Sequence, residues 1–93
     1  MTKLTPELTN TLAATRKAFG MTQDELARAV KVSRQTVSSM EQGAYNPSAT
    51  LALRLAALFG VSVEQLFALP EAEKVELDAL RQRFLQARSK EKA

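Results

Sequence analysis

Apolar residues recur along this chain at intervals of three and four, the spacing of one face of an α-helix. The first such stripe consists of Leu4, Leu8, Leu12 and Phe19. It predicts a helix over residues 6–19, with Thr5 as its N-cap and Gly20 in a left-handed conformation at its end. Strand signals are absent along the chain. The pattern therefore predicts an all-α protein.

Four shorter helices follow, and hydrogen-bonding side chains mark where each one begins. The four N-cap residues are Thr22, Ser33, Ser48 and Ser62. Glu25 follows the first of them by three residues and Gln65 follows the last, which is the spacing of a capping box. The predicted helices cover residues 23–30, 33–42, 49–58 and a short stretch that contains Leu66 and Phe67.

Two of these helices distribute their apolar residues differently. Residues 33–42 place Val37 and Met40 on one face and leave polar or short side chains elsewhere, with no acid before the last turn. Residues 49–58 are apolar around almost the whole circumference, which predicts a place in the centre of the core. Residues 43–47 are rich in turn formers and predict a loop between the two.

The last predicted helix begins at Glu71, after Pro70, and reaches about Ser89. Its apolar stripe, over about two heptads, consists of Leu77, Leu80, Phe84 and Ala87. Residues 70–79 carry four acids and one base, whereas residues 80–93 carry five bases and one acid, an order that suits a helix dipole. The stripe either packs on the helices of its own subunit or contacts a second copy or another protein. Both alternatives remain open at this point.

Composition narrows the chemistry that the chain can perform. The 93 residues include no His and no Cys, the residues on which zinc sites and Ser-His or Cys-His nucleophile pairs depend. We therefore expect no metal, no cofactor and no enzymatic activity. The longest apolar run is far shorter than the roughly 20 residues that cross a bilayer. We expect a cytoplasmic protein without a membrane partner, and the net charge of +3 is compatible with a polyanion.

Four sequence blocks carry a resemblance to a known family. They are Thr22-Gln23-x-x-Leu26-Ala27, Val32-Ser33-Arg34-Gln35-Thr36-Val37-Ser38, Glu41-x-Gly43-x-Tyr45-x-Pro47-Ser48 and Phe59-Gly60-Val61-Ser62. At this spacing they resemble the Cro/C1-type (XRE) helix-turn-helix regulators over about residues 8–69. The resemblance implies a compact five-helix, lambda-repressor-like DNA-binding domain over residues 5–69. Residues 70–93 form an additional C-terminal helix and a basic tail.

The resemblance also implies which residues contact double-stranded DNA. The helix over residues 33–42 becomes the recognition helix, whose Arg and Gln side chains suit guanine and adenine in the major groove. The implied base contacts are Arg34, Gln35, Ser38 and Ser39. The implied backbone contacts are Gln23, Ser33, Thr36, Tyr45 and Asn46. The competing interpretations are an exposed polar helix face for the first group, and capping or packing roles for members of the second.

Further positions of the family pattern concern structure and assembly. Arg16 and Glu41 match a buried ion pair that joins the first helix to the end of the recognition helix. Lys31 stands where the family usually has Gly, and a left-handed conformation there costs roughly 1–2 kcal/mol for a side chain. The family's two-fold contacts match Val63, Leu66 and Phe67. The alternative surface for a dimer or another partner is the stripe of Leu77, Leu80 and Phe84.

The sequence therefore predicts a transcriptional regulator, in particular a repressor that binds a palindromic operator as a homodimer. One alternative is an antitoxin, which uses the same domain and also neutralises a partner toxin. A second is a protein-interaction adaptor that acts through the C-terminal helix. A small hydrolase that uses carboxylates is a remote third, because no motif supports it.

Overall fold

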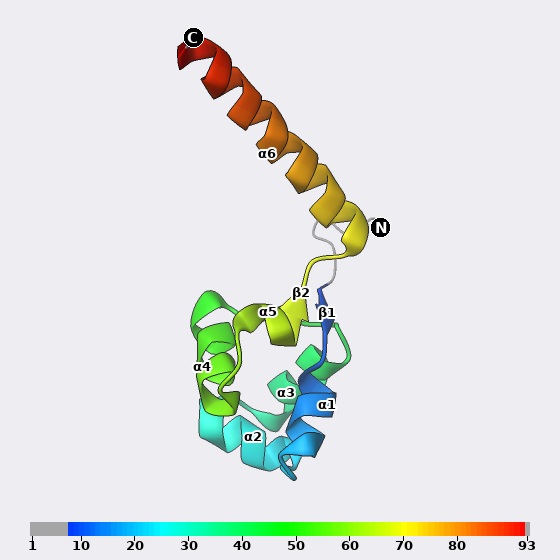
Figure 1. Cartoon of the computed structure of the whole chain (residues 1–93). Helices are drawn as coiled ribbons and strands as arrows, with labels where there is room; N and C mark the ends of the chain where they lie inside the picture. The colour runs from blue at the N-terminus through cyan, green and yellow to red at the C-terminus, as the bar shows by residue number, and fades with distance from the viewer. Residues whose placement is uncertain (1–7, 93) are drawn as a thin grey trace.

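A computed structural model describes residues 8–92 of the chain, with side chains through Arg88. Within this range the elements in order are β1 (Thr9–Asn10), α1 (Leu12–Ala18), α2 (Gln23–Val30), α3 (Arg34–Glu41), α4 (Ala49–Phe59), α5 (Val63–Leu66), β2 (Phe67–Ala68) and α6 (Glu71–Lys92). Figure 1 shows that the first five helices form one domain, from which α6 extends as a long rod. The fold is mostly helical, as the pattern predicts.

The short helices begin where their capping residues place them. In α2 the Thr22 hydroxyl accepts a hydrogen bond from the Glu25 amide at 3.0 Å, and the Glu25 carboxylate accepts one from the Thr22 amide at 2.8 Å. The same reciprocal pair joins Ser62 and Gln65 at the start of α5. These bonds satisfy backbone amides that have no partner within the helix. Ser33 and Ser48 cap α3 and α4 through single bonds.

The first helix differs from its prediction, because it begins at Leu12 rather than at residue 6. Thr9 and Asn10 are extended and pair antiparallel with Ala68 and Phe67. The expected cap, Thr5, lies outside the described residues. A pairing of two residues per strand is too short to leave an alternating pattern, so no sequence signal predicts it. This small β1–β2 ladder lies between the helical domain and α6 (Figure 1).

The core lies among the first five helices. Its fully buried side chains are Leu12, Leu26, Val37, Met40, Leu55 and Leu66. The prediction for α4 was only partly right, because Leu53 is 62 % exposed and Leu58 is also exposed. Phe19, expected on a buried stripe, is also exposed and packs edge-to-face against Phe59, with 4.9 Å between ring centroids. The apolar surface of α4 is thus larger than the area that the other helices of the domain cover.

Helix α6 does not fold back on its own domain in this structure. Leu77, Leu80 and Phe84 are all exposed, and the rod points away from α1–α5 (Figure 1). Of the two alternatives for its apolar stripe, packing within the subunit is therefore not observed. Among the described residues, no helix is both long enough and apolar enough to cross a membrane.

Candidate nucleic-acid interface

The turn between α2 and α3 sets the direction of the recognition helix. Helix α2 ends at Val30, and its C-cap, Lys31, is left-handed with φ of 64°. The Val32 amide donates to the Ala27 carbonyl at 3.0 Å. A Gly would adopt this conformation without strain, so the Lys31 side chain costs roughly 1–2 kcal/mol. Ser33 then caps α3 through the amide of Thr36 at 3.1 Å. The geometry of this turn is therefore retained without its usual Gly.

One face of α3 is anchored in the core and the opposite face is open. Val37 and Met40 are buried against the rest of the domain. Arg34 and Gln35 are exposed at the start of the helix. Ser38 and Ser39 are half-buried on the following turn. The helix thus offers a polar surface whose position is fixed by the apolar side chains behind it.

Hydroxyl and amide groups continue this polar surface along α3. The hydroxyls of Ser33 and Thr36 lie 2.9 Å apart at its N-terminus. At the other end, the Gln42 amide nitrogen donates to the Ser38 hydroxyl oxygen at 3.2 Å. Both bonds orient short side chains that suit hydrogen bonding to phosphates or base edges. The sequence patterns did not single out Gln42 as part of this surface, because it stands at the end of the predicted helix, directly before Gly43.

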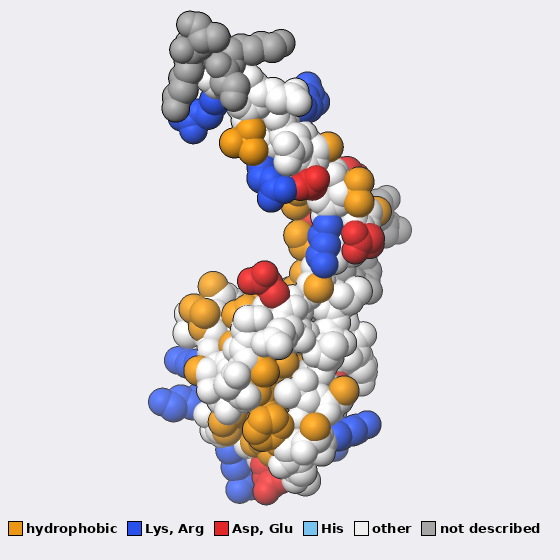
Figure 2. All heavy atoms as spheres, viewed as in Figure 1, with side chains coloured by type: hydrophobic (Ala, Val, Ile, Leu, Met, Phe, Trp, Pro, Cys, Tyr) orange, Lys and Arg blue, Asp and Glu red, His pale blue; other side chains and the backbone are white. Residues whose placement is uncertain are grey.

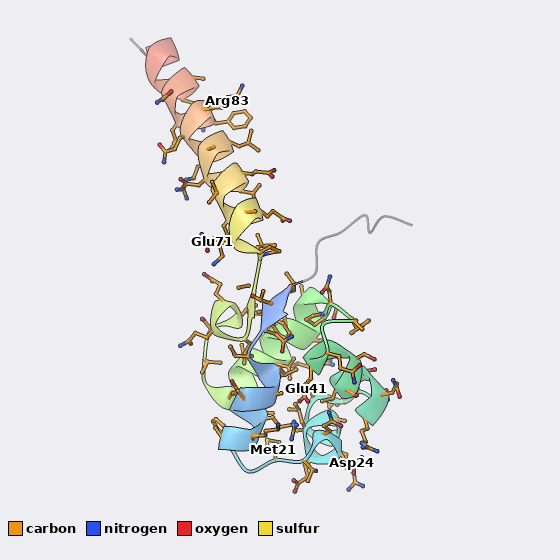
Figure 3. The ribbon with its side chains drawn as sticks, turned by 90° about the vertical axis from the view of Figure 1, so that its right-hand side faces the viewer. Met21, Asp24, Glu41, Glu71 and Arg83 are labelled. Atoms are coloured by element: carbon orange, nitrogen blue, oxygen red, sulfur yellow. The ribbon has the colours of Figure 1, made fainter. Side chains whose placement is uncertain are left out.

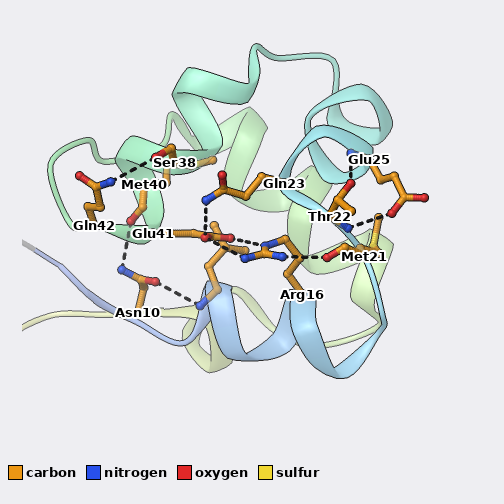
Figure 4. Close-up of polar contacts among 11 residues, drawn as sticks. Asn10, Arg16, Met21, Thr22, Gln23, Glu25, Ser38, Met40, Glu41 and Gln42 are labelled. Atoms are coloured by element: carbon orange, nitrogen blue, oxygen red, sulfur yellow. Dashed lines mark hydrogen bonds and ion pairs between the residues drawn. The ribbon is translucent and has the colours of Figure 1, made fainter.

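A buried ion pair connects α3 to α1, as Figure 4 shows. The Arg16 Nε lies 2.6 Å from Glu41 Oε2, and Arg16 Nη2 lies 3.2 Å from Glu41 Oε1. Arg16 Nη1 also donates to the Met21 carbonyl oxygen at 2.8 Å. Both charged side chains are about nine-tenths buried. The bidentate arrangement therefore fixes the end of α3 relative to α1.

Gln23 is the third member of this network. Its amide nitrogen donates to Glu41 Oε1 at 2.9 Å, so α2 is joined to the same carboxylate (Figure 4). Gln23 is half-buried at the first position of α2, where backbone N–H groups point outward and attract phosphates. The side chain therefore braces α3 at the same position where a phosphate contact is expected.

The network determines the charge state of its members. Burial acts to raise the pKa of Glu41, but the hydrogen bonds from Arg16 and Gln23 outweigh it and hold that pKa below its usual value. The hydrogen bond and charge of Glu41 in turn raise the pKa of Arg16. The backbone and side-chain hydrogen bonds at Thr22 lower the pKa of Glu25. Both carboxylates are thus stabilised in the charged form.

Most acids of the domain have a hydrogen-bond or charge partner nearby. Residues 8–69 carry six bases and four acids. Asp24 pairs with Arg28 at 2.9 Å, Glu25 is part of a capping box, and Glu41 is held by Arg16. Figure 2 shows Lys and Arg side chains projecting from both sides of the domain. This charge balance favours a polyanionic partner.

Two other groups of predicted residues lie apart from α3. Tyr45 and Asn46 are exposed in the loop between α3 and α4. Of the expected two-fold contacts, Leu66 is 1 % and Phe67 7 % exposed, because both pack into the core of their own domain. Little of either side chain is left on the surface for a partner, and a two-fold contact at these positions stays a prediction. Val63 alone is half-exposed, in an apolar groove that it shares with Leu69 and Lys74.

Several proteins similar to this chain are named as transcriptional regulators. Residues 12–66 match the helix-turn-helix family. An uncharacterized HTH-type transcriptional regulator of Archaeoglobus fulgidus is 45 % identical over 58 residues, which are 62 % of this chain and 83 % of that protein. The uncharacterized HTH-type transcriptional regulator YgzD of Bacillus subtilis is 40 % identical over 62 residues, 67 % of this chain and 94 % of that protein.

Two solved structures share the fold. The hypothetical transcription factor NHTF from Neisseria superposes with a TM-score of 0.57 and 33 % identity, over 72 % of this chain and 74 % of that one. The clp gene regulator ClgR from Corynebacterium glutamicum gives a TM-score of 0.54 and 28 % identity, over 87 % and 77 % of the two chains. With the matched motifs and the fold on which they lie, these similarities show that the chain belongs to the Cro/C1-type helix-turn-helix family of DNA-binding transcriptional regulators, not to an enzyme family.

Proposed function

We propose that this protein is a sequence-specific repressor that binds a palindromic DNA operator as a homodimer, with α3 in the major groove. The observation that carries the proposal is the division of α3 into two faces. Val37 and Met40 hold it from behind, and Arg34 and Gln35 are exposed on it. Because the exposed side chains begin in the first turn, they meet base edges when the N-terminus of α3 enters the groove.

In this arrangement base reading and backbone contact belong to different residues. Arg34 reads guanine and Gln35 reads adenine through paired hydrogen bonds. Ser38 and Ser39 contact bases or phosphates within the shorter reach of a hydroxyl. The backbone contacts, which position the domain on the duplex without reading sequence, come from Gln23, Ser33, Thr36, Tyr45 and Asn46.

The small DNA-contacting surface of a single copy favours a homodimer. One helix of eight residues reads only a few base pairs, whereas two copies on a two-fold axis read two half-sites and gain affinity and selectivity together. Repression requires only that the bound protein occupies the operator, a task that a single small DNA-binding domain fulfils. The direction of regulation is therefore proposed as repression.

Selection of binding sites from random double-stranded DNA tests this function. We expect the wild-type chain to enrich a palindrome and the Arg34→Ala/Gln35→Ala variant to enrich none. The matched control is Arg54→Ala/Gln86→Ala, which removes the same two residue types from exposed positions on α4 and α6 and should select the wild-type site. Folded wild-type protein that enriches no sequence, even at low salt, would refute the proposal.

A further inference from the structure

Helix α6 carries apolar side chains that the described part of the chain leaves uncovered. Phe84 is 71 % exposed, and Leu77 and Leu80 are exposed on the same stripe. A shallow groove on this face is lined by Leu80, Arg83, Phe84 and Ala87. Figure 2 shows apolar side chains along the length of the helix. A contiguous apolar surface of this kind is typical of an interaction site.

The charges on α6 indicate what covers this stripe. The first half of the helix is acidic and carries Glu71, Glu73, Glu76 and Asp78. The second half is basic and carries Arg81, Arg83 and Arg88. Figure 3 labels Glu71 at the start of the helix and Arg83 further along the rod. A partner that matches both halves has the same order of charges in the opposite direction, and a second α6 provides this order when it runs antiparallel.

A parallel arrangement of two copies is less favourable. It places the acidic halves side by side and the basic halves side by side, and it aligns the two helix dipoles. The antiparallel arrangement sets the acidic first half of each helix against the basic end of the other, with Glu76 across from Arg88, and it leaves Arg81 and Arg83 of both copies near the two-fold axis. Arg81, close to the two-fold axis, is already paired with Asp78 of its own helix, which weakens its repulsion of the second Arg81.

The apolar residues have a register that is compatible with the antiparallel pair. When Leu80 lies across from Phe84 of the second copy, Leu77 lies across from Ala87. Each layer then repeats on the other side of the axis, as a two-fold contact requires. The spacings of three and four along the stripe are those that two packed helices share.

We propose that α6 is the dimerisation arm of this protein and pairs antiparallel with α6 of a second copy. This inference rests on the homodimer of the proposed function and supplies its interface. At a rise of about 1.5 Å per residue, the first residues of the two arms lie about 33 Å apart. The two DNA-binding domains are attached at these opposite ends of the paired arms.

Sedimentation of the full chain over a wide range of concentrations tests the interface. We expect a monomer–dimer equilibrium whose dissociation constant rises at least about tenfold in Leu80→Ser, because the lost apolar contact occurs twice in a two-fold pair. Leu85→Ser is the matched control, since Leu85 is an exposed leucine of α6 that lies off the stripe. It should leave the constant within about twofold. A monomer at every concentration, or equal effects of the two variants, would overturn the proposal.

Disulfide cross-linking tests the direction of the pair, because the chain has no Cys of its own. In a mixture of Leu77→Cys and Ala87→Cys variants, oxidation should link one variant to the other. The antiparallel pair places like positions about 15 Å apart, too far for a disulfide. Linkage of each variant only to itself would show a parallel pair and refute the arrangement.

The outcome is distinguishable from failure of the proposed function. If Leu80→Ser remains dimeric and still selects the wild-type palindrome, the regulator is a dimer through another surface and only the inference about α6 fails. If the wild type dimerises through α6 but selects no DNA sequence, the interface stands without the proposed function, and the dimer serves another role.

Discussion

Helices α3 and α6 differ in what holds them and in which side chains they expose. Helix α3 has eight residues, fewer than the roughly 12–15 that an isolated helix needs. It is held by buried Val37 and Met40 and by the Arg16–Glu41 ion pair. Helix α6 has 22 residues and, beyond its first turn, projects from the described domain with its side chains exposed. The first exposes a polar face and the second an apolar stripe.

The difference shows that the two helices are suited to different partners. A polar face fixed from behind by a buried carboxylate is suited to hydrogen bonding with base edges. An apolar stripe on a projecting helix is suited to burial against another apolar surface. If this comparison is correct, changes behind α3 should unfold the domain, whereas changes along α6 should affect assembly alone.

The largest effect is expected for Glu41→Ala. Removal of one partner leaves Arg16 as an uncompensated charge in a buried site, which lowers the free energy of unfolding by about 3–5 kcal/mol. Urea unfolding measures this loss. Glu76→Ala on exposed α6 is the control and should change stability by less than about 0.5 kcal/mol. Weakened DNA binding by Glu41→Ala at an unchanged melting temperature would disprove the structural role of this carboxylate.

Acid should weaken the same network. The folded-state pKa of Glu41 lies below the ordinary value of 4.5, so its contribution to stability is complete above that value and is lost as the pH falls through the folded-state pKa. We expect urea midpoints to decline below about pH 4.5, and less steeply in Glu41→Gln. Glu25 shifts in the same direction and contributes to the same decline. Equal pH dependence in wild type and Glu41→Gln would argue against this assignment.

A smaller loss is expected for Asn10→Ala. The Asn10 carboxamide accepts from the Leu12 amide and donates to the Met40 carbonyl, both at 3.1 Å (Figure 4). Loss of both bonds should lower stability by about 1–3 kcal/mol. Asn46→Ala, in an exposed loop, is the control for unfolding measurements. If the two variants were equally stable, the link from β1 to α3 would contribute nothing.

The smallest effect is expected at the α2–α3 turn, and it is a gain. Lys31→Gly relieves a left-handed side chain but increases the entropy of the unfolded chain, so the net stabilisation is about 1 kcal/mol or less. Thermal unfolding measures it, with Lys17→Gly at an exposed position of α1 as a destabilising comparison. A lower melting temperature for Lys31→Gly would mean that the Lys side chain makes a compensating contact.

The comparison also explains how much the sequence could predict. Caps such as Thr22 and Ser62 act within one turn, and a local pattern therefore places the starts of α2 and α5. The Arg16–Glu41 pair was implied only through the family resemblance. Asn10 and the β1–β2 ladder were missed, because their partners lie 30 and more residues away and leave no periodic signal. The sequence pattern left open whether α6 packs on its own domain or projects from it, because the second alternative depends on the surface of a partner. The sequence of a single chain does not describe that surface.

We propose that the buried face of α3 holds the helix while its exposed face reads DNA. The most direct test compares specific with non-specific DNA affinity, together with the melting temperature, in Arg34→Ala/Gln35→Ala. We predict that the ratio of the two affinities falls at least about tenfold, because each bidentate base contact contributes about 1–3 kcal/mol of discrimination. The melting temperature should stay unchanged. An unchanged ratio in a folded variant would contradict the claim.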